Sequence, residues 1–83
     1  MKTFYLYTTD GCGFCQRAKE LLERRKLNFI MLDLDREHPT LVQLKQEMDW
    51  GTVPMVFQID ERDHRFIGGY TDLLEYLGEE NER

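Results

Sequence analysis

The chain has 83 residues, a net charge of −5 and only two cysteines. This length predicts a single domain over residues 1–83 with a modest core, because so short a chain buries only about 60% of its unfolded surface. The negative charge argues against nucleic-acid binding, which depends on Lys and Arg neutralising phosphates. No apolar run approaches the roughly 20 residues of a membrane helix, and no secretory signal precedes the first strand pattern. We therefore expect an intracellular protein, most simply a cytoplasmic one.

The first half of the chain predicts a strand, a helix and a second strand. Residues 2–8 are apolar on both faces, which favours a central strand covered on both sides. Residues 13–26 carry apolar side chains at helical spacing with charges opposite them. Residues 28–34 predict another strand, and the link between the two strands is long enough for a parallel, right-handed crossover.

A second helix and a pair of strands follow. His38-Pro39 begins the helix, with the proline near the first helical position, and Trp50-Gly51 ends it. Met55–Ile59 predicts a strand, residues 60–64 a charged turn, and residues 65–67 a short last strand.

The chain closes with a third helix, from about Thr71 to Leu77, which Thr71 or Asp72 would cap. Gly68-Gly69 separates it from the last strand, and the polar tail 79–83 is expected to fray. The predicted order is β-α-β-α-β-β-α, an α/β fold.

Cys12-Gly13-Phe14-Cys15 lies where the first strand meets the first helix. Two cysteines with this spacing, beside a βαβ pattern, indicate a thioredoxin-like redox motif. A thiolate at a helix start is stabilised by unpaired N–H groups and the helix dipole, so such cysteines have pKa values of about 3.5 to 7.5. The competing hypothesis is half of a zinc site. Structural zinc needs four ligands, and His38 and His64 fall in different loops, so we expect no metal site.

Three segments together strongly resemble the glutaredoxins. They are residues 12–19 (CGFCQRAK), Thr52-Val53-Pro54 and Gly68-Gly69-Tyr70-Thr71-Asp72, in the order and spacing of that family. The match covers nearly the whole chain and is nearest to small bacterial and phage dithiol members. The resemblance implies a minimal thioredoxin fold, a four-stranded mixed sheet with three helices on its two faces.

The resemblance also assigns the site. It implies that Cys12 is the nucleophile and that Cys15, one helical turn deeper, is the resolving thiol. It implies a cis bond before Pro54, which frees the Val53 backbone to pair with a ligand, and a clamp for the γ-glutamyl end of glutathione at the start of the third helix. The residues that it places against glutathione are Gly13, Phe14, Thr52, Val53, Pro54, Gly69, Tyr70, Thr71 and Asp72.

The implied activity is a glutathione-dependent reduction of protein disulfides and glutathione mixed disulfides by a monomer. Glutathione would be the co-substrate, and ribonucleotide reductase is the protein substrate that the family most often suggests. Two alternatives stay open. One is an iron–sulfur carrier, a dimer that holds a [2Fe–2S] cluster through Cys12 and glutathione. The other keeps the chemistry but takes electrons from thioredoxin reductase.

The chain departs from the family pattern in two places. Gly13-Phe14 replaces the common Pro-Tyr, and small residues after the first cysteine occur in cluster-binding members. Thr9 stands where the family usually has Lys or Arg, and acidic Asp10 follows it. Arg17 and Lys45 are the candidate substitutes for that missing cation.

Overall fold

The computed structural model of the chain describes residues 2–78, so the expected fraying of 79–83 lies outside the described residues. The predicted order of elements is confirmed. It is β1 (Thr3–Thr8), α1 (Gly13–Arg24), β2 (Phe29–Asp33), α2 (Pro39–Glu47), β3 (Met55–Ile59), β4 (His64–Gly68) and α3 (Tyr70–Tyr76).

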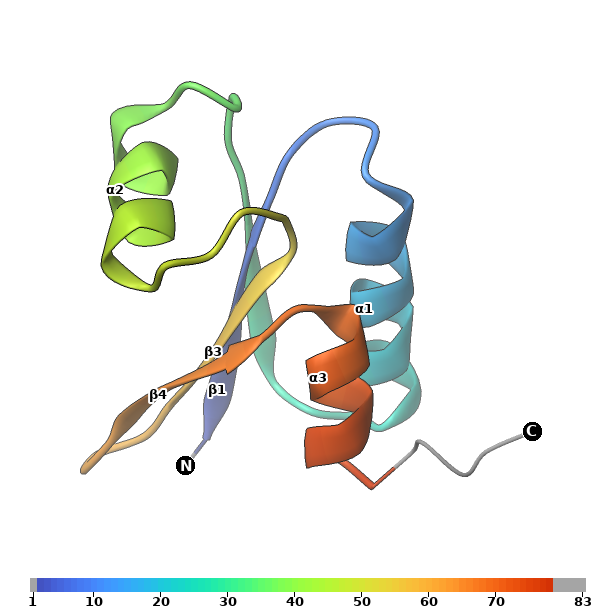
Figure 1. Cartoon of the computed structure of the whole chain (residues 1–83). Coiled ribbons are helices and arrows are strands. Elements are labelled where there is room, and N and C mark those ends of the chain that lie inside the picture. Colours follow the sequence, from blue (N-terminus) through green and yellow to red (C-terminus); the bar gives the residue numbers. More distant parts are fainter. Residues whose placement is uncertain (1, 79–83) are drawn as a thin grey trace.

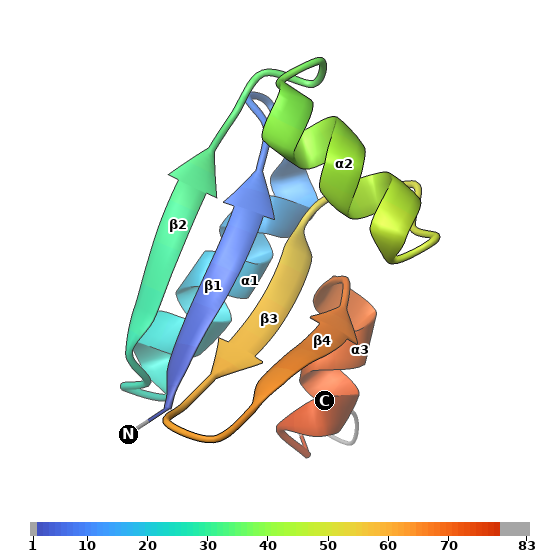
Figure 2. The same ribbon diagram turned by 90° about the vertical axis from the view of Figure 1, so that its left-hand side faces the viewer.

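The four strands form one mixed sheet in the order β2-β1-β3-β4. β1 pairs parallel with β2, while β3 pairs antiparallel with both β1 and β4. Helices α1 and α3 lie together on one face of the sheet and α2 lies on the other (Figure 1). Viewed face-on, α2 crosses only the end of the sheet at which β1 and β2 finish (Figure 2). This is the arrangement expected of a minimal thioredoxin fold.

The main core fills the space between the sheet and the two helices α1 and α3. Alternate residues of β1 point into it, and α1 contributes buried side chains at helical spacing. Its fully or nearly fully buried members are Phe4, Leu6, Ala18, Leu21, Leu22, Val56 and Leu73. Because burial of apolar surface is the main favourable term in folding, this core holds β1 and α1 firmly against each other. The short segment that joins them is therefore fixed at both ends.

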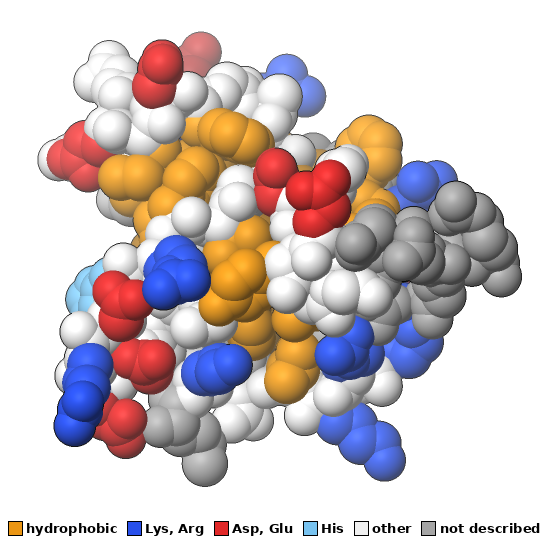
Figure 3. All heavy atoms as spheres, turned by 60° about the horizontal axis from the view of Figure 1, so that its bottom comes forward, with side chains coloured by type: hydrophobic (Ala, Val, Ile, Leu, Met, Phe, Trp, Pro, Cys, Tyr) orange, Lys and Arg blue, Asp and Glu red, His pale blue; other side chains and the backbone are white. Residues whose placement is uncertain are grey.

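The opposite sheet face is covered only in part. Tyr7 lies on this face, turned away from the main core, and its ring packs edge-on against Phe57 at 5.7 Å. A hollow of about 390 Å³ lies between α2 and the exposed part of the sheet, where Phe57 and Phe66 reach its wall. On the face drawn in Figure 3, hydrophobic side chains form a band among interspersed acidic and basic groups. None of the helices within residues 2–78 is long and apolar enough to cross a membrane.

One predicted helix end and one predicted helix cap were wrong. Helix α2 ends at Glu47, before Trp50, because the chain turns into a left-handed conformation at Asp49, with a φ of 52°. Helix α3 begins at Tyr70 with Gly69 as its N-cap, so neither Thr71 nor Asp72 holds the N-cap position. Asp72 caps the helix from its third position instead, since its carboxylate accepts the Gly69 N–H at 2.9 Å.

The predicted charged turn connects β3 and β4. The Asp60 carboxylate accepts the backbone N–H groups of Arg62 and Asp63, both at 2.9 Å. The bond from the Arg62 N–H is the main reason that the pKa of Asp60 lies below its ordinary value. The turn lies at the opposite end of the sheet from the cysteines, so it shapes the fold and not the site.

Candidate active site

Cys12 is the N-cap of α1, at the end of the segment that leaves β1. Its sulfur accepts the backbone N–H of Cys15 at 3.0 Å and lies 3.8 Å from the carbonyl oxygen of Val53. A sulfur in this place sits at the positive end of the helix dipole, which favours the thiolate over the thiol when the cysteine is reduced. The helix start thus prepares Cys12 for nucleophilic attack.

Cys15 forms a disulfide with Cys12 and lies in the first turn of α1. Only 1% of Cys15 is exposed, whereas Cys12 is half-buried. A sulfur that arrives from solvent therefore reaches Cys12 first. Cys15 is placed to attack the Cys12 sulfur from the inner side afterwards.

The segment that faces the disulfide contains the Val53-Pro54 peptide bond, which is cis, as the resemblance implied. Pro54 is buried and its carbonyl oxygen lies close to Gly69, where an added Cβ would be 3.7 Å from that oxygen. The Gly68-Gly69 turn is thus packed against the loop before β3. The chain brings together here two of the three segments that the sequence singled out.

Aromatic side chains link the cysteine motif to the start of α3. The rings of Phe14 and Tyr70 lie 5.9 Å apart, and the guanidinium of Arg17 lies 5.3 Å from the centroid of the Phe14 ring. Phe14 is 55% exposed, so this wall of the site is open to solvent. Thr71 is exposed at the second position of α3. Arg17 lies against this aromatic wall.

A recess of about 350 Å³ lies between the cysteine motif and the loop before β3. Gly13, Phe14, Thr52 and Val53 line it together with Cys12, so four of the predicted glutathione contacts meet in one hollow. Two cations also line it, Lys45 from α2 and Arg36 from the loop that follows β2. We call this hollow the basic recess. Of the two candidate substitutes for the missing cation, Lys45 reaches it, and Arg36 was not anticipated from the sequence.

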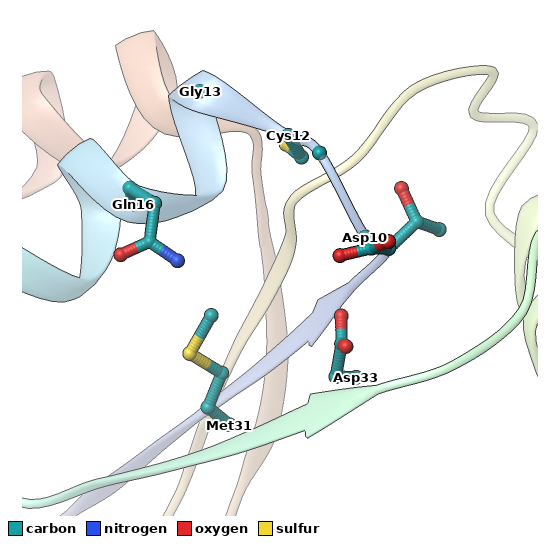
Figure 4. A pocket seen from close by; sticks show the side chains of 8 residues that line it. Asp10, Cys12, Gly13, Gln16, Met31 and Asp33 are labelled. Atoms are coloured by element: carbon teal, nitrogen blue, oxygen red, sulfur yellow. The ribbon is translucent and has the colours of Figure 1, made fainter.

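A second recess of about 400 Å³ lies on the other side of Cys12, between the first turn of α1 and β2 (Figure 4). It is lined by Gln16, Met31 and Asp33, which do not line the basic recess. We call the hollow that these three residues and Asp10 line the acidic recess. The segment from Thr9 to Gly13 lines both hollows and forms the wall between them. Thr9 itself is 7% exposed, so it contributes mainly to the interior of that wall.

The comparisons with known proteins agree with this geometry. The model of the glutaredoxin family matches residues 5–64. The chain belongs to the glutaredoxin family. It is 32% identical to glutaredoxin 3 of Escherichia coli over 88% of this chain and 83% of that protein. It is also 35% identical to the hybrid peroxiredoxin hyPrx5 of Haemophilus influenzae, where the match spans 87% of this chain but only 28% of the longer protein.

Solved glutaredoxin structures share the fold. Glutaredoxin 1 of Francisella tularensis, solved with cacodylate, matches with a TM-score of 0.75 at 26% identity and covers 94% of both chains. A buckwheat glutaredoxin solved with glutathione matches with a TM-score of 0.73 at 25% identity, over 94% of this chain and 72% of that one. The family and the Cys12–Cys15 pair make this chain a thiol–disulfide oxidoreductase. Within residues 2–78 no group of three or more His, Cys, Asp or Glu could hold a metal ion.

Proposed function

We propose that this glutaredoxin is a glutathione-dependent oxidoreductase that reduces protein disulfides and glutathione mixed disulfides, with Cys12 as nucleophile and Cys15 as resolving thiol. The observation that carries the proposal is the position of the Cys12 sulfur. It lies at the helix start, beside the Val53 carbonyl oxygen and in the wall of the basic recess. Glutathione is the proposed reductant, and a cytoplasmic location fits a disulfide that must be reduced again after each turnover.

The proposed reaction with a protein disulfide has three steps. The Cys12 thiolate attacks one sulfur of the substrate, a mixed disulfide forms, and the other substrate sulfur leaves as a thiolate. The Cys15 thiolate then attacks the Cys12 sulfur, which releases the second substrate thiol and leaves the Cys12–Cys15 disulfide. Two glutathione molecules reduce that disulfide to the dithiol and leave as glutathione disulfide. A glutathione mixed disulfide needs only Cys12, because a second glutathione can release the first.

The charges around the site support glutathione as the reductant. Glutathione carries two carboxylates and one ammonium group. Lys45 and Arg36 in the basic recess provide cations near Cys12, in place of the family cation that Thr9 replaces. Asp72 provides a carboxylate near the other end of the site, where Tyr70 meets Phe14. An extended ligand that pairs with the Val53 backbone would thus meet cations at one end and an anion at the other.

A coupled assay tests the electron source. The protein would be supplied with NADPH and a model disulfide, either through glutathione and glutathione reductase or through thioredoxin reductase alone. We expect NADPH consumption to depend on glutathione in the first system and to be negligible in the second. Turnover with thioredoxin reductase and no glutathione would refute glutathione dependence while leaving the dithiol chemistry intact.

A further inference from the structure

The acidic recess adjoins Cys12 but contains none of the glutathione-contact residues that come from the loop before β3 or from α3. It begins at the same wall, Thr9 to Gly13, and opens in the other direction, towards β2. A disulfide substrate has two arms that leave the bond under attack. If glutathione or its equivalent occupies the basic recess, the acidic recess is the hollow next to Cys12 that remains for the other arm.

The lining of the acidic recess has a defined chemistry. In Figure 4, Met31 points up from β2 towards α1 and Gln16 points down towards it, so that a thioether and an amide face each other across the hollow. The carboxylates of Asp10 and Asp33 lie together on the other side of the hollow, and Asp10 belongs to the same segment as Cys12. Two carboxylates beside the segment that carries Cys12, with the Met31 thioether on the opposite side of the hollow, suit a cationic side chain whose aliphatic stem contacts Met31.

Asp33 is held in place from within the fold. Thr8 is fully buried, and its hydroxyl donates to the Asp33 carboxylate at 3.0 Å. Thr8 and Asp33 are paired across β1 and β2, so this bond fixes the carboxylate at the end of the sheet nearest the cysteines. The negative charge is thus part of the rigid frame of the recess.

We propose that the acidic recess selects protein substrates by binding a Lys or Arg side chain next to the cysteine that Cys12 attacks. The basic recess shares Asp10 with the acidic recess but also contains Lys45 and Arg36, so it is the less favourable of the two hollows for the same side chain. This inference rests on the part of the proposed function in which Cys12 attacks a protein disulfide, and its test needs no glutathione. The electrons come from the protein dithiol, which becomes the Cys12–Cys15 disulfide as the substrate disulfide becomes a dithiol.

The test uses cyclic peptides that each contain one disulfide and differ only in the residues that flank one cysteine, which are Lys, Gln or Glu. Fully reduced protein, freed of reductant, is mixed with each peptide without glutathione. Samples quenched with acid at successive times give the rate at which the peptide disulfide is converted to the peptide dithiol. Each rate is divided by the rate with dithiothreitol, because Lys and Glu also change the intrinsic reactivity of the peptide. The normalised rate with the Lys peptide is divided by that with the Glu peptide. We expect this Lys/Glu ratio to be at least about five at low salt and to fall in high salt.

Three variants locate the effect. Asp33→Asn keeps an oxygen for the Thr8 hydroxyl but loses the charge, and we expect it to lower the Lys/Glu ratio by about two- to fivefold, as one exposed ion pair would. Asp10→Asn should lower the ratio by a similar factor. Glu75→Gln removes the same charge from an exposed position on α3 and should keep the ratio of the parent protein.

A normalised ratio near one in the parent protein, including equal failure to react with every peptide, overturns the proposal. So does a fall with Glu75→Gln that matches the fall with Asp33→Asn, because the net charge would then explain the preference. Loss of glutathione turnover in the coupled assay would refute the proposed reductant without changing this result.

Discussion

Asp72 gives the sharpest test of the glutathione proposal, because its carboxylate has a structural contact that can be separated from ligand binding. It accepts the Gly69 N–H at 2.9 Å and so caps α3. Replacement by Asn leaves a side-chain oxygen for that N–H but removes the charge, whereas replacement by Ala removes both. The two variants therefore distinguish the cap from the charge.

The expected magnitudes follow from these contacts. Loss of an N-terminal capping contact costs about 1 kcal/mol, so Asp72→Ala should lower the melting temperature by roughly 4–8 °C in a domain of this size. Asp72→Asn should keep most of that stability. A charge-assisted contact to an ammonium group contributes about 1.5 kcal/mol at the lower end of its range, which suits the half-buried Asp72. Both variants should then raise the apparent KM for glutathione by about tenfold.

The assay needs two measurements on each variant. Thermal or denaturant unfolding of the reduced proteins, with dithiothreitol present, gives stability without the disulfide. Turnover of a small mixed disulfide at varied glutathione, coupled to glutathione reductase, gives the apparent KM. The parent protein and Glu75→Gln, whose side chain lies on the exposed part of α3, serve as references.

One pattern of results would refute the reasoning. If Asp72→Asn keeps the glutathione dependence of the parent while Asp72→Ala only loses stability, Asp72 is a cap alone. That outcome would strengthen the alternative in which thioredoxin reductase supplies the electrons.

Three further predictions address the cysteines, the basic recess and the turn before α3. Cys12→Ser should abolish all activity, while Cys15→Ser should still reduce glutathione mixed disulfides but not protein disulfides; iodoacetamide should label Cys12 much faster than Cys15 in the reduced protein, and equal rates would contradict the assignment. Lys45→Ala should raise the apparent KM for glutathione about two- to fivefold at low salt, with recovery in Lys45→Arg, and an effect that persists unchanged at high salt would argue against a charge contact. Gly68→Ala should destabilise the fold by about 1–3 kcal/mol in denaturant unfolding, because φ is 123° and the added Cβ would lie 2.7 Å from the Cγ of the carboxylate that caps α3. In Gly51→Ala the added Cβ meets no atom within 4 Å, so this variant should keep nearly the stability of the parent. Equal losses of stability in the two variants would show that the effect of Gly68→Ala does not come from strain at that position.

The fold was predictable because its elements have strong local patterns. Apolar residues in β1 and at helical spacing in α1 identify the core, and the order of elements follows from them. The ends of α2 and α3 were less predictable. A left-handed residue at Asp49 has no distinct sequence signal, and the Asp72 carboxylate can cap from either of two positions until the backbone of Gly69 is known.

The site was predictable only where residues are close in sequence or fall in a known motif. Gly13 and Phe14 follow directly from the cysteine spacing. Arg36 and Asp33 carry no motif, and they reach the site because parallel β1 and β2 end at the same edge of the sheet. A search of the last residues of each predicted parallel strand and of the residues just after it would have found both.

The shared wall from Thr9 to Gly13 also bears on how tightly a substrate is held. A mixed disulfide of glutathione and a protein is one molecule with two arms, and the wall that carries Cys12 has a hollow on each side. When one arm is seated, the other is tethered within a few bond lengths of its own hollow, so its local concentration is far above that in solution. Two individually weak contacts can then combine into bivalent binding. This bivalent binding ends when thiol–disulfide exchange separates the two arms, and the separation favours release of the reduced product.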